Sequence, residues 1–269
     1  MLSAFAQTPE PTPQASPSAK PTPTPWPEVT PPADPAKFDL ILLVGQSNMA
    51  GRGKLADADR VPDPRIYTLD QSNRWVNQGQ PIHFDKPVAG AGIGFYFGKL
   101  LTEANPGVTV GLIPCAVGGT SVKLWQPGQK LYDNALARAK IALKSGRLKA
   151  ILWHQGESDS GRQESVDAYA ALLKTTLESF RKDLDAPNVP IILGELGEFG
   201  FLNKDGTPTL KPKINEIMHT VAAEIPNTTV VPAKGLMDGG DKLHFNTEAL
   251  QEFGKRYFEV WQKSATSNP

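Results

Sequence analysis

Short apolar runs alternate with longer amphipathic segments along this chain. Runs with the length and residue types of buried strands lie at residues 40–44, 108–113, 150–153, 190–194 and 228–231. Segments with helical periodicity lie at residues 94–103, 131–145, 163–184, 211–224 and 247–262. Strands that alternate with helices predict a parallel sheet with helices on both faces. We therefore expect a three-layer α/β/α sandwich around a five-stranded parallel sheet.

The N-terminal part of the chain has a different composition. Residues 8–35 consist mainly of Pro, Thr, Ser and Ala, and Trp26 is the main large apolar side chain among them. A segment of this kind cannot bury enough surface to offset the entropy that is lost on ordering. We expect residues 1–35 to form a disordered linker and residues 36–269 to form one folded domain.

A short pattern at the start of the chain bears on location. Ser3-Ala4-Phe5-Ala6-Gln7 has the small-x-small form of a signal-peptidase site and directly precedes the linker. The charged and apolar parts of a signal peptide do not precede it, so the pattern is equally compatible with chance. With the linker, it favours a secreted or extracellular protein that is tethered to another module.

Composition argues against several classes of protein. The 28 basic and 28 acidic residues balance, without a basic run, which gives no reason to expect nucleic acid or an anionic membrane as a partner. No apolar stretch has the length of a membrane span. The single cysteine, Cys115, cannot form an internal disulfide, and the four histidines lack the spacing of zinc ligands. We expect neither a metal nor a cofactor.

Candidate catalytic residues follow the first strand and precede the last helix. Gly45-Gln46-Ser47 comes directly after the first apolar run, at the edge of the sheet where open α/β proteins place their sites. Asp241 precedes His244 by three residues, just before the last helical segment. A serine nucleophile, a histidine base and an acid that orients the base form a serine hydrolase triad. Taken singly, Ser47 is also a good helix N-cap and His244 a good packing residue.

Hydrogen-bond donors for an oxyanion follow the next strands. Gly118-Gly119 comes after the second strand and exposes backbone N–H groups, and Gln155 comes after the third strand. Acyl transfer needs such donors, because a negative charge develops on the substrate oxygen. The N–H of Ser47 is a further candidate. Gln46, Asn48, Gly119 and His154 are candidate supporting residues.

Four sequence blocks resemble the SGNH-hydrolase superfamily. They are Gly45-Gln46-Ser47-Asn48-Met49-Ala50-Gly51, Gly118-Gly119-Thr120-Ser121, Trp153-His154-Gln155-Gly156-Glu157-Ser158-Asp159, and Asp241-x-x-His244. Within the superfamily they resemble acetylxylan esterases of carbohydrate esterase family six and sialate O-acetylesterase-like proteins. The resemblance implies a flavodoxin-like fold, Ser47 as nucleophile and His244 as base. It also implies Ser47, Gly118 and Gln155 as oxyanion donors, with Gln155 where the wider superfamily has Asn.

The sequence is compatible with two roles for each of three further side chains. Glu157 either bonds within the site or replaces Asp241 as the acid that orients His244, and Asp241 is favoured on its motif. His154 is a rival base, but its place directly after a strand favours a structural role. Trp125 either stacks on a sugar ring or packs under the glycine loop.

The function that we expect is removal of O-acetyl groups from carbohydrate, such as acetylated xylan or its oligomers. The absence of an apolar lid in the sequence argues for a small acyl pocket. Three alternatives stay open: a sialate or other sugar O-acetylesterase, a non-catalytic carbohydrate-binding module, and a short-chain lipid or thioester hydrolase.

Overall fold

The computed structural model describes residues 26–203 and 205–266. The proposed signal-peptidase pattern and the linker up to residue 25 lie outside the described residues. From Pro27 onward the chain runs along the edge of the sheet, where the N–H of Val29 donates to the carbonyl oxygen of Trp75 over 2.9 Å. The N–H of Asn77 donates to Pro27 over 3.2 Å. Ordered contacts therefore begin before the boundary predicted at residue 36.

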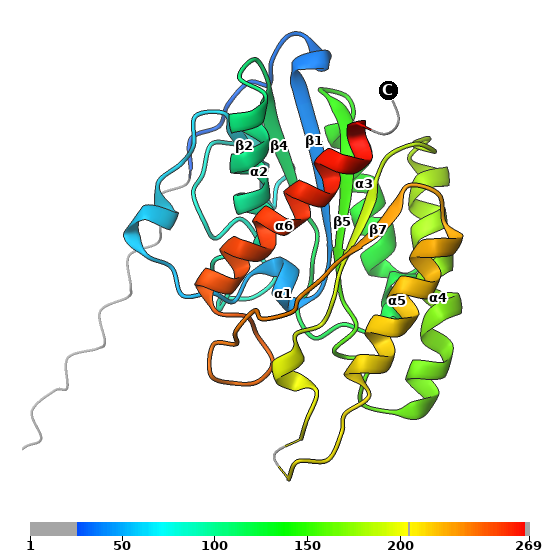
Figure 1. The fold of residues 1–269 in the computed structure, drawn as a ribbon. Helices are drawn as coiled ribbons and strands as arrows, with labels where there is room; N and C mark the ends of the chain where they lie inside the picture. The colour runs from blue at the N-terminus through cyan, green and yellow to red at the C-terminus, as the bar shows by residue number, and fades with distance from the viewer. Residues whose placement is uncertain (1–25, 204, 267–269) are drawn as a thin grey trace, which may run out of the picture.

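A seven-stranded sheet forms the centre of the molecule, in the order β3-β2-β4-β1-β5-β6-β7 (Figure 1). The strands are β1 (Phe38–Gly45), β2 (Ile66–Leu69), β3 (Trp75–Val76), β4 (Thr109–Pro114), β5 (Arg147–His154), β6 (Ile191–Gly194) and β7 (Thr228–Val231). All neighbours are parallel except β2 and β3, which are antiparallel. The predicted α/β class is confirmed, but the predicted count of five strands is too low. The two additional strands lie at one edge and are only four and two residues long, so their apolar patterns are too short to recognise.

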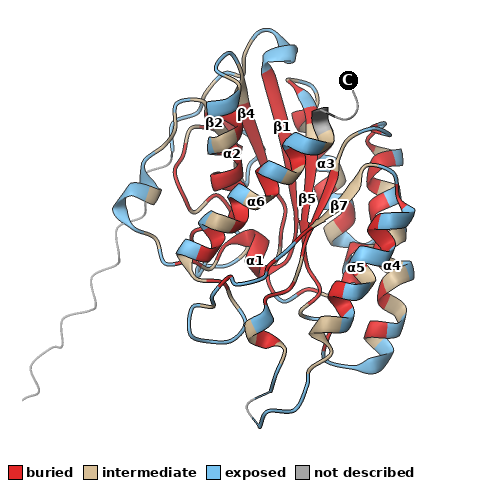
Figure 2. Ribbon diagram, in the orientation of Figure 1, coloured by how far each residue is buried: buried red, intermediate tan, exposed pale blue. Residues whose placement is uncertain are grey.

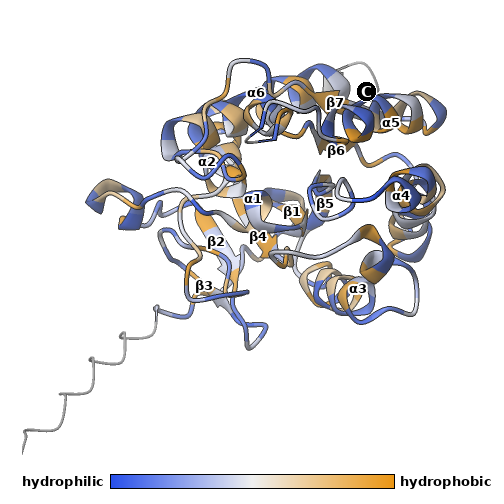
Figure 3. Ribbon diagram, turned by 90° about the horizontal axis from the view of Figure 1, so that it is seen from below, coloured by the Kyte–Doolittle hydropathy of each residue, from blue (hydrophilic) through white to orange (hydrophobic). Residues whose placement is uncertain are grey.

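Helices cover both faces of the sheet, as the view along it in Figure 3 shows. The α-helices are α1 (Ser47–Ala50), α2 (Ile93–Ala104), α3 (Lys130–Ala142), α4 (Gln163–Asp183), α5 (Lys211–Glu224) and α6 (Thr247–Thr266). Short 3-10 turns are η1 (Pro35–Lys37), η2 (Asp57–Arg60), η3 (Val122–Trp125) and η4 (Glu198–Gly200). Side chains of α3, α4 and α5 share one core cluster, and those of α2 and α6 share the other. None of the described helices has a stretch long and apolar enough to cross a membrane.

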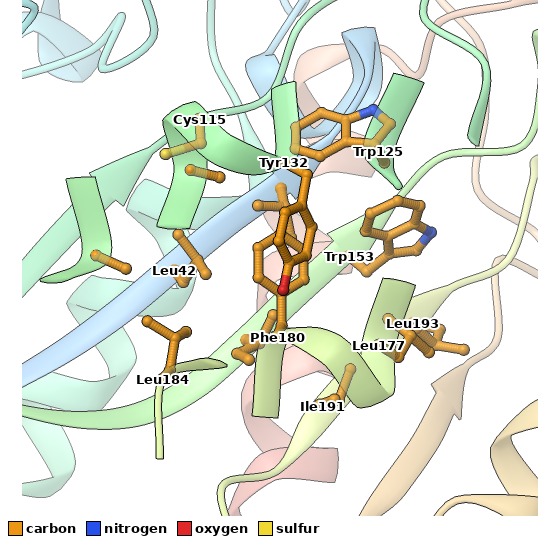
Figure 4. Close-up of a cluster of buried hydrophobic side chains, with 14 of the residues drawn as sticks. Leu42, Cys115, Trp125, Tyr132, Trp153, Leu177, Phe180, Leu184, Ile191 and Leu193 are labelled. Atoms are coloured by element: carbon orange, nitrogen blue, oxygen red, sulfur yellow. The ribbon is translucent and has the colours of Figure 1, made fainter. Parts of the chain in front are cut away.

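Strand β1 is buried along its whole length (Figure 2). Its side chains alternate between the two core clusters: Leu40 and Leu42 point to one, and Ile41 and Leu43 to the other. On the α3 and α4 side, Tyr132 and Phe180 stack with ring centroids 4.5 Å apart beneath the strands (Figure 4). Burial on both faces is what the continuous apolar run at residues 40–44 predicts.

The end of β1 turns sharply at Gly45, which has a φ of 126°. A Cβ at this position would collide with the backbone of His154 in β5. The N–H of the next residue, Gln46, donates to the carbonyl oxygen of His154 over 2.8 Å. Glycine therefore permits both the turn and the close approach of β1 and β5, and this turn places Ser47 at the edge of the sheet.

We expect Gly45→Ala to lower the free energy of unfolding by about 2–4 kcal/mol, because it combines a disfavoured φ with a backbone collision. Urea unfolding measures this loss. Gly98→Ala in α2 is the control, since a Cβ there would meet the side chains of Leu112 and Ile66 at ordinary distances of 3.4 and 3.6 Å. We expect the control to be neutral or slightly stabilising. Equal effects of the two substitutions would contradict this account of Gly45.

Candidate active site

Ser47, His244 and Asp241 form a hydrogen-bonded chain at the carboxyl end of β1. Ser47 lies in the first turn of α1, behind Gln46 at the N-cap position, so it is not itself the cap. The Oγ of Ser47 lies 3.0 Å from Nε2 of His244. The other ring nitrogen of His244, Nδ1, lies 2.6 Å from Oδ2 of Asp241. The structure thus brings together the three residues that the sequence motifs predict as a triad.

Asp241 and His244 belong to one short folded loop before α6. Oδ1 of Asp241 accepts the N–H groups of Leu243 and His244, each over 2.8 Å, while Oδ2 faces the ring. Partial burial opposes the charge of Asp241, but these backbone N–H groups and the His244 ring hold its pKa below the usual value. The carboxylate therefore stays charged in weakly acidic solution.

Gly118 lies beside Ser47, but its N–H is occupied. A Cβ at position 118 would lie 3.4 Å from Cβ of Ser47 and would collide with the Arg52 guanidinium. The N–H of Gly118 donates to Oδ2 of Asp85 over 2.9 Å, and Arg52 binds the same oxygen over 2.6 Å. Burial opposes the charge of Asp85, whereas Arg52 and the Gly118 N–H lower its pKa. The Arg52–Asp85 pair, which sequence analysis missed, thus fixes the glycine loop.

Gln155 does not lie where the resemblance predicts. Its side chain is fully buried, and Nε2 donates to the carbonyl oxygen of Thr120 over 2.9 Å and to the carboxylate of Asp159. Asp159, itself 1% exposed, also accepts bonds from Ser121 Oγ and from the N–H of Val122. Both amide hydrogens of Gln155 are used inside the protein, so in this structure the amide ties the end of β5 to the glycine loop instead of facing an oxyanion.

Two backbone N–H groups remain as donors near the nucleophile. Among the described residues, neither the N–H of Ser47 nor that of Gly119 has a protein acceptor. Gly119 has a φ of 79° and lines the same cavity as Ser47. These two groups are therefore available to a substrate oxygen in the present conformation, whereas Gly118 and Gln155 are not.

Glu157 and His154 lie beneath the site. Glu157 is 4% exposed and bonds Asn48 Nδ2 over 2.6 Å, without a hydrogen bond to His244. His154 is fully buried and packs its ring against Phe245 and Phe253. Neither residue reaches Ser47, so the geometry favours Asp241 over Glu157 and His244 over His154.

Gln46 and Trp125 are structural in this arrangement. The Oε1 of Gln46 accepts the N–H of Ser158 over 3.3 Å, which joins the turn after β1 to the segment after β5. Trp125 is fully buried, stands edge-on to Trp153 and donates to Thr120 Oγ1 over 3.2 Å. Of the two interpretations of Trp125, packing under the glycine loop is the one observed.

A cavity of about 590 Å³ opens over Ser47 and His244. Most of its lining is polar or glycine, and the apolar side chains in it are those of Val88 and Leu243. Lys86 lines it too and makes no ion pair with any described residue. Within the described residues, no cluster of three His, Cys, Asp or Glu side chains could hold a metal.

Comparison with known proteins places this geometry in a family. A family model described as "Carbohydrate esterase, sialic acid-specific acetylesterase" matches residues 37–263. The chain is 31% identical over 236 residues to "Probable carbohydrate esterase At4g34215" of Arabidopsis thaliana, a match that covers 80% of this chain and 86% of the relative. The crystal structure of that Arabidopsis protein superimposes with a TM-score of 0.76 at 30% identity, over 85% of this chain and 99% of the other.

More distant structures share the fold. The structure of NanS has a TM-score of 0.64 at 15% identity, over 87% of this chain and 99% of the other. A structure described as a novel carbohydrate acetylesterase, XAC1771 from Xanthomonas citri, has a TM-score of 0.62 at 16% identity, over 86% of this chain and 57% of the other. The sandwich architecture predicted from the sequence is therefore shared with these proteins.

We expect Asp241→Asn to lower kcat for p-nitrophenyl acetate by about 10³–10⁴-fold. The two backbone N–H groups retain the amide oxygen, so the NH2 group faces Nδ1 of His244. The ring then carries its proton on Nε2 and cannot accept one from Ser47.

Glu157→Gln is the matched comparison, because the glutamine oxygen can still accept the hydrogen bond from Nδ2 of Asn48. We expect this variant to keep most of the esterase activity. If Glu157→Gln abolished turnover while Asp241→Asn kept it, Glu157 would be the orienting acid.

Proposed function

The chain belongs to the sialic acid-specific acetylesterase family of carbohydrate esterases and is a carboxylic ester hydrolase, and we propose that it deacetylates xylan or xylan oligomers through Ser47, His244 and Asp241. Both the family and the four sequence blocks point to carbohydrate acetylesterase activity. The polysaccharide and the triad mechanism are the specific parts of the proposal. The observation that carries it is the Ser47–His244–Asp241 hydrogen-bonded chain beside a cavity that polar residues and glycines line.

The mechanism begins with proton transfer from Ser47. Oγ attacks the acetyl carbonyl carbon while Nε2 of His244 takes its proton. The N–H groups of Ser47 and Gly119 donate to the oxyanion that forms. The bond from the carbonyl carbon to the sugar oxygen then breaks, and His244 returns the proton to that oxygen.

The second half restores the enzyme. Water attacks the acetyl group on Ser47, with His244 again taking a proton, and acetate leaves as Ser47 is reprotonated. Asp241 keeps the proton of His244 on Nδ1 in both halves and stabilises the charged ring.

The shape and lining of the cavity support a short acyl group on a sugar. Polar and charged residues outnumber apolar ones around the cavity, so side chains that can bind sugar hydroxyl groups are present. The apolar surface that the lining also exposes can receive an acetyl methyl. The Pro/Thr-rich residues 8–35 support a secreted, tethered enzyme, the setting in which polysaccharides are degraded.

A sialate O-acetylesterase is the second candidate, on one observation. Lys86 lines the cavity and has no carboxylate partner among the described residues, so its ammonium is available to the carboxylate of an acidic sugar. Xylose carries no such group. A sialate O-acetylesterase would therefore use Lys86 to bind its substrate, whereas a xylan deacetylase would not need it.

We expect Ser47→Ala to fold normally and to lose hydrolysis of p-nitrophenyl acetate by about 10⁴–10⁶-fold, as when other triad nucleophiles are removed. Circular dichroism checks the fold. Ser72→Ala, in the exposed turn between β2 and β3, is the control and should retain full activity. A Ser47→Ala preparation that kept a tenth of the turnover would rule out Ser47 as the nucleophile.

We expect acetate release from acetylated xylan, and faster cleavage of p-nitrophenyl acetate than of the butyrate or octanoate. The panel includes 9-O-acetyl sialic acid, and each substrate is measured with wild type and Lys86→Ala. Activity on xylan that is insensitive to Lys86→Ala supports the first candidate. Activity confined to the sialate and reduced by Lys86→Ala supports the second. Preference for octanoate, with no acetate from any glycan, would contradict both.

A further inference from the structure

The side chain of Asn48 joins the helix of the nucleophile to the loop of the base. Asn48 follows Ser47 in α1 and is 1% exposed. Its Nδ2 donates to the carbonyl oxygen of Leu243 over 3.2 Å, and its Oδ1 accepts the N–H of Phe245 over 3.1 Å. Leu243 and Phe245 are the two neighbours of His244 in the chain. One amide thus binds the backbone on both sides of the base.

The loop that carries His244 has few other hydrogen bonds to the body of the protein. Within the loop, Asp238 accepts the N–H groups of Gly240 and Lys242, and Asp241 binds His244. Apart from Asn48 and Ser47, the described residues outside residues 238–245 supply one hydrogen bond to it, from Lys211 Nζ over 3.5 Å. The Asp241 side chain is 52% exposed. The position of His244 therefore depends on Asn48 together with the buried ring of Phe245, which packs against Phe199 and Phe253.

Glu157, together with the backbone of Leu243 and Phe245, determines which way the Asn48 amide points. A carboxylate only accepts hydrogen bonds, so Oε1 of Glu157, 2.6 Å away, requires the NH2 group of Asn48 on its side. This leaves Oδ1 facing the N–H of Phe245. His154 Nε2 lies 3.4 Å from the same Glu157 oxygen. Burial opposes the charge of Glu157, but His154 and Asn48 hold its pKa below the usual value.

We infer that Asn48 is a positioning residue that holds the His244 ring against Ser47, and that Glu157 acts through Asn48 by fixing the orientation of its amide. The inference rests on the proposed function, in which His244 takes the Ser47 proton. It gives Glu157 a part in the reaction without contact to the base. A displacement of His244 by about 1 Å costs on the order of 100-fold in rate. The expected defect is therefore in kcat, with KM unchanged.

Asn48→Asp tests the inference with little change of shape. It keeps an oxygen for Phe245 but places a second oxygen against Leu243 and Glu157, so two hydrogen bonds become repulsive contacts. We expect kcat for p-nitrophenyl acetate to fall about 10–100-fold at unchanged KM. Adding Glu157→Gln supplies an NH2 group to the new carboxylate, and we expect the double variant to regain a large part of the lost kcat. Glu157→Gln alone still offers an oxygen to Asn48 but no longer excludes the opposite amide orientation, so we expect its kcat to lie between those of Asn48→Asp and wild type.

Asn215→Asp is the matched control for a buried asparagine that binds backbone in both directions. Asn215 is 8% exposed, accepts the N–H of Leu196 over 2.8 Å and donates to its carbonyl oxygen over 3.1 Å. We expect it to lower Tm without lowering kcat per folded molecule. A second readout is the low-field proton NMR signal of the His244 Nδ1–H, which should broaden in Asn48→Asp and sharpen again in the double variant.

Three results would overturn the inference: equal kcat losses in Asn48→Asp and Asn215→Asp, no recovery on adding Glu157→Gln, or a change confined to KM. If Asn48→Asp does not fold, Asn48→Ala takes its place, and its kcat loss should not be repaired by Glu157→Gln. Ser47→Ala and His244→Ala test the proposed function separately from the positioning role of Asn48. Activity in both would refute the proposed function, whereas their inactivity beside a fully active Asn48→Asp would refute the positioning role alone.

Discussion

The close contact between β1 and β5 determines where the candidate site can form. β1 is buried on both faces and paired on both edges, to β4 and β5, so the chain can leave it only at its ends. At Gly45 the backbone lies so near His154 that no Cβ fits, and the next N–H binds the His154 carbonyl oxygen. Ser47, the proposed nucleophile, thus follows a tightly constrained point of the sheet, with strands on either side whose loops supply the rest of the site.

Buried carboxylates organise the loops around that point. Asp159 ties the glycine loop to β5, Asp85 holds Gly118 against Arg52, and Glu157 joins His154 to Asn48. Burying such charges is unfavourable unless donors surround them, and each of these carboxylates accepts at least one bond from another segment. Polar contacts between loops from different strands therefore complement the apolar cores beneath the sheet.

The sequence allowed the architecture and the pairing of Asp241 with His244 to be predicted because both are local patterns. Runs such as residues 40–44 are long and apolar enough to identify strands, and Asp241 lies close enough to His244 for one loop to join them. β2 and β3 were not predicted, because edge strands of four and two residues are too short to show an alternating pattern of apolar and polar residues. The contacts of Gln155 could not be predicted for another reason: its amide meets Asp159 and Thr120 only after folding, and a resemblance in residue type says nothing of which acceptors lie nearby. The same holds for the Arg52–Asp85 pair, whose members are 33 positions apart.

The two halves of the site differ in how firmly they are held. Ser47 is bound to a fully buried strand, whereas Asp241 and His244 lie on a loop with an exposed face. A few polar contacts and the buried ring of Phe245 join this loop to the body. Local opening of such a loop has a lower free energy than global unfolding. On heating, the base would leave the nucleophile while the sheet is still intact, so the temperature of reversible inactivation would lie below the melting temperature. Thermal tolerance of catalysis would then be a property of about eight residues and could be adjusted without altering either core.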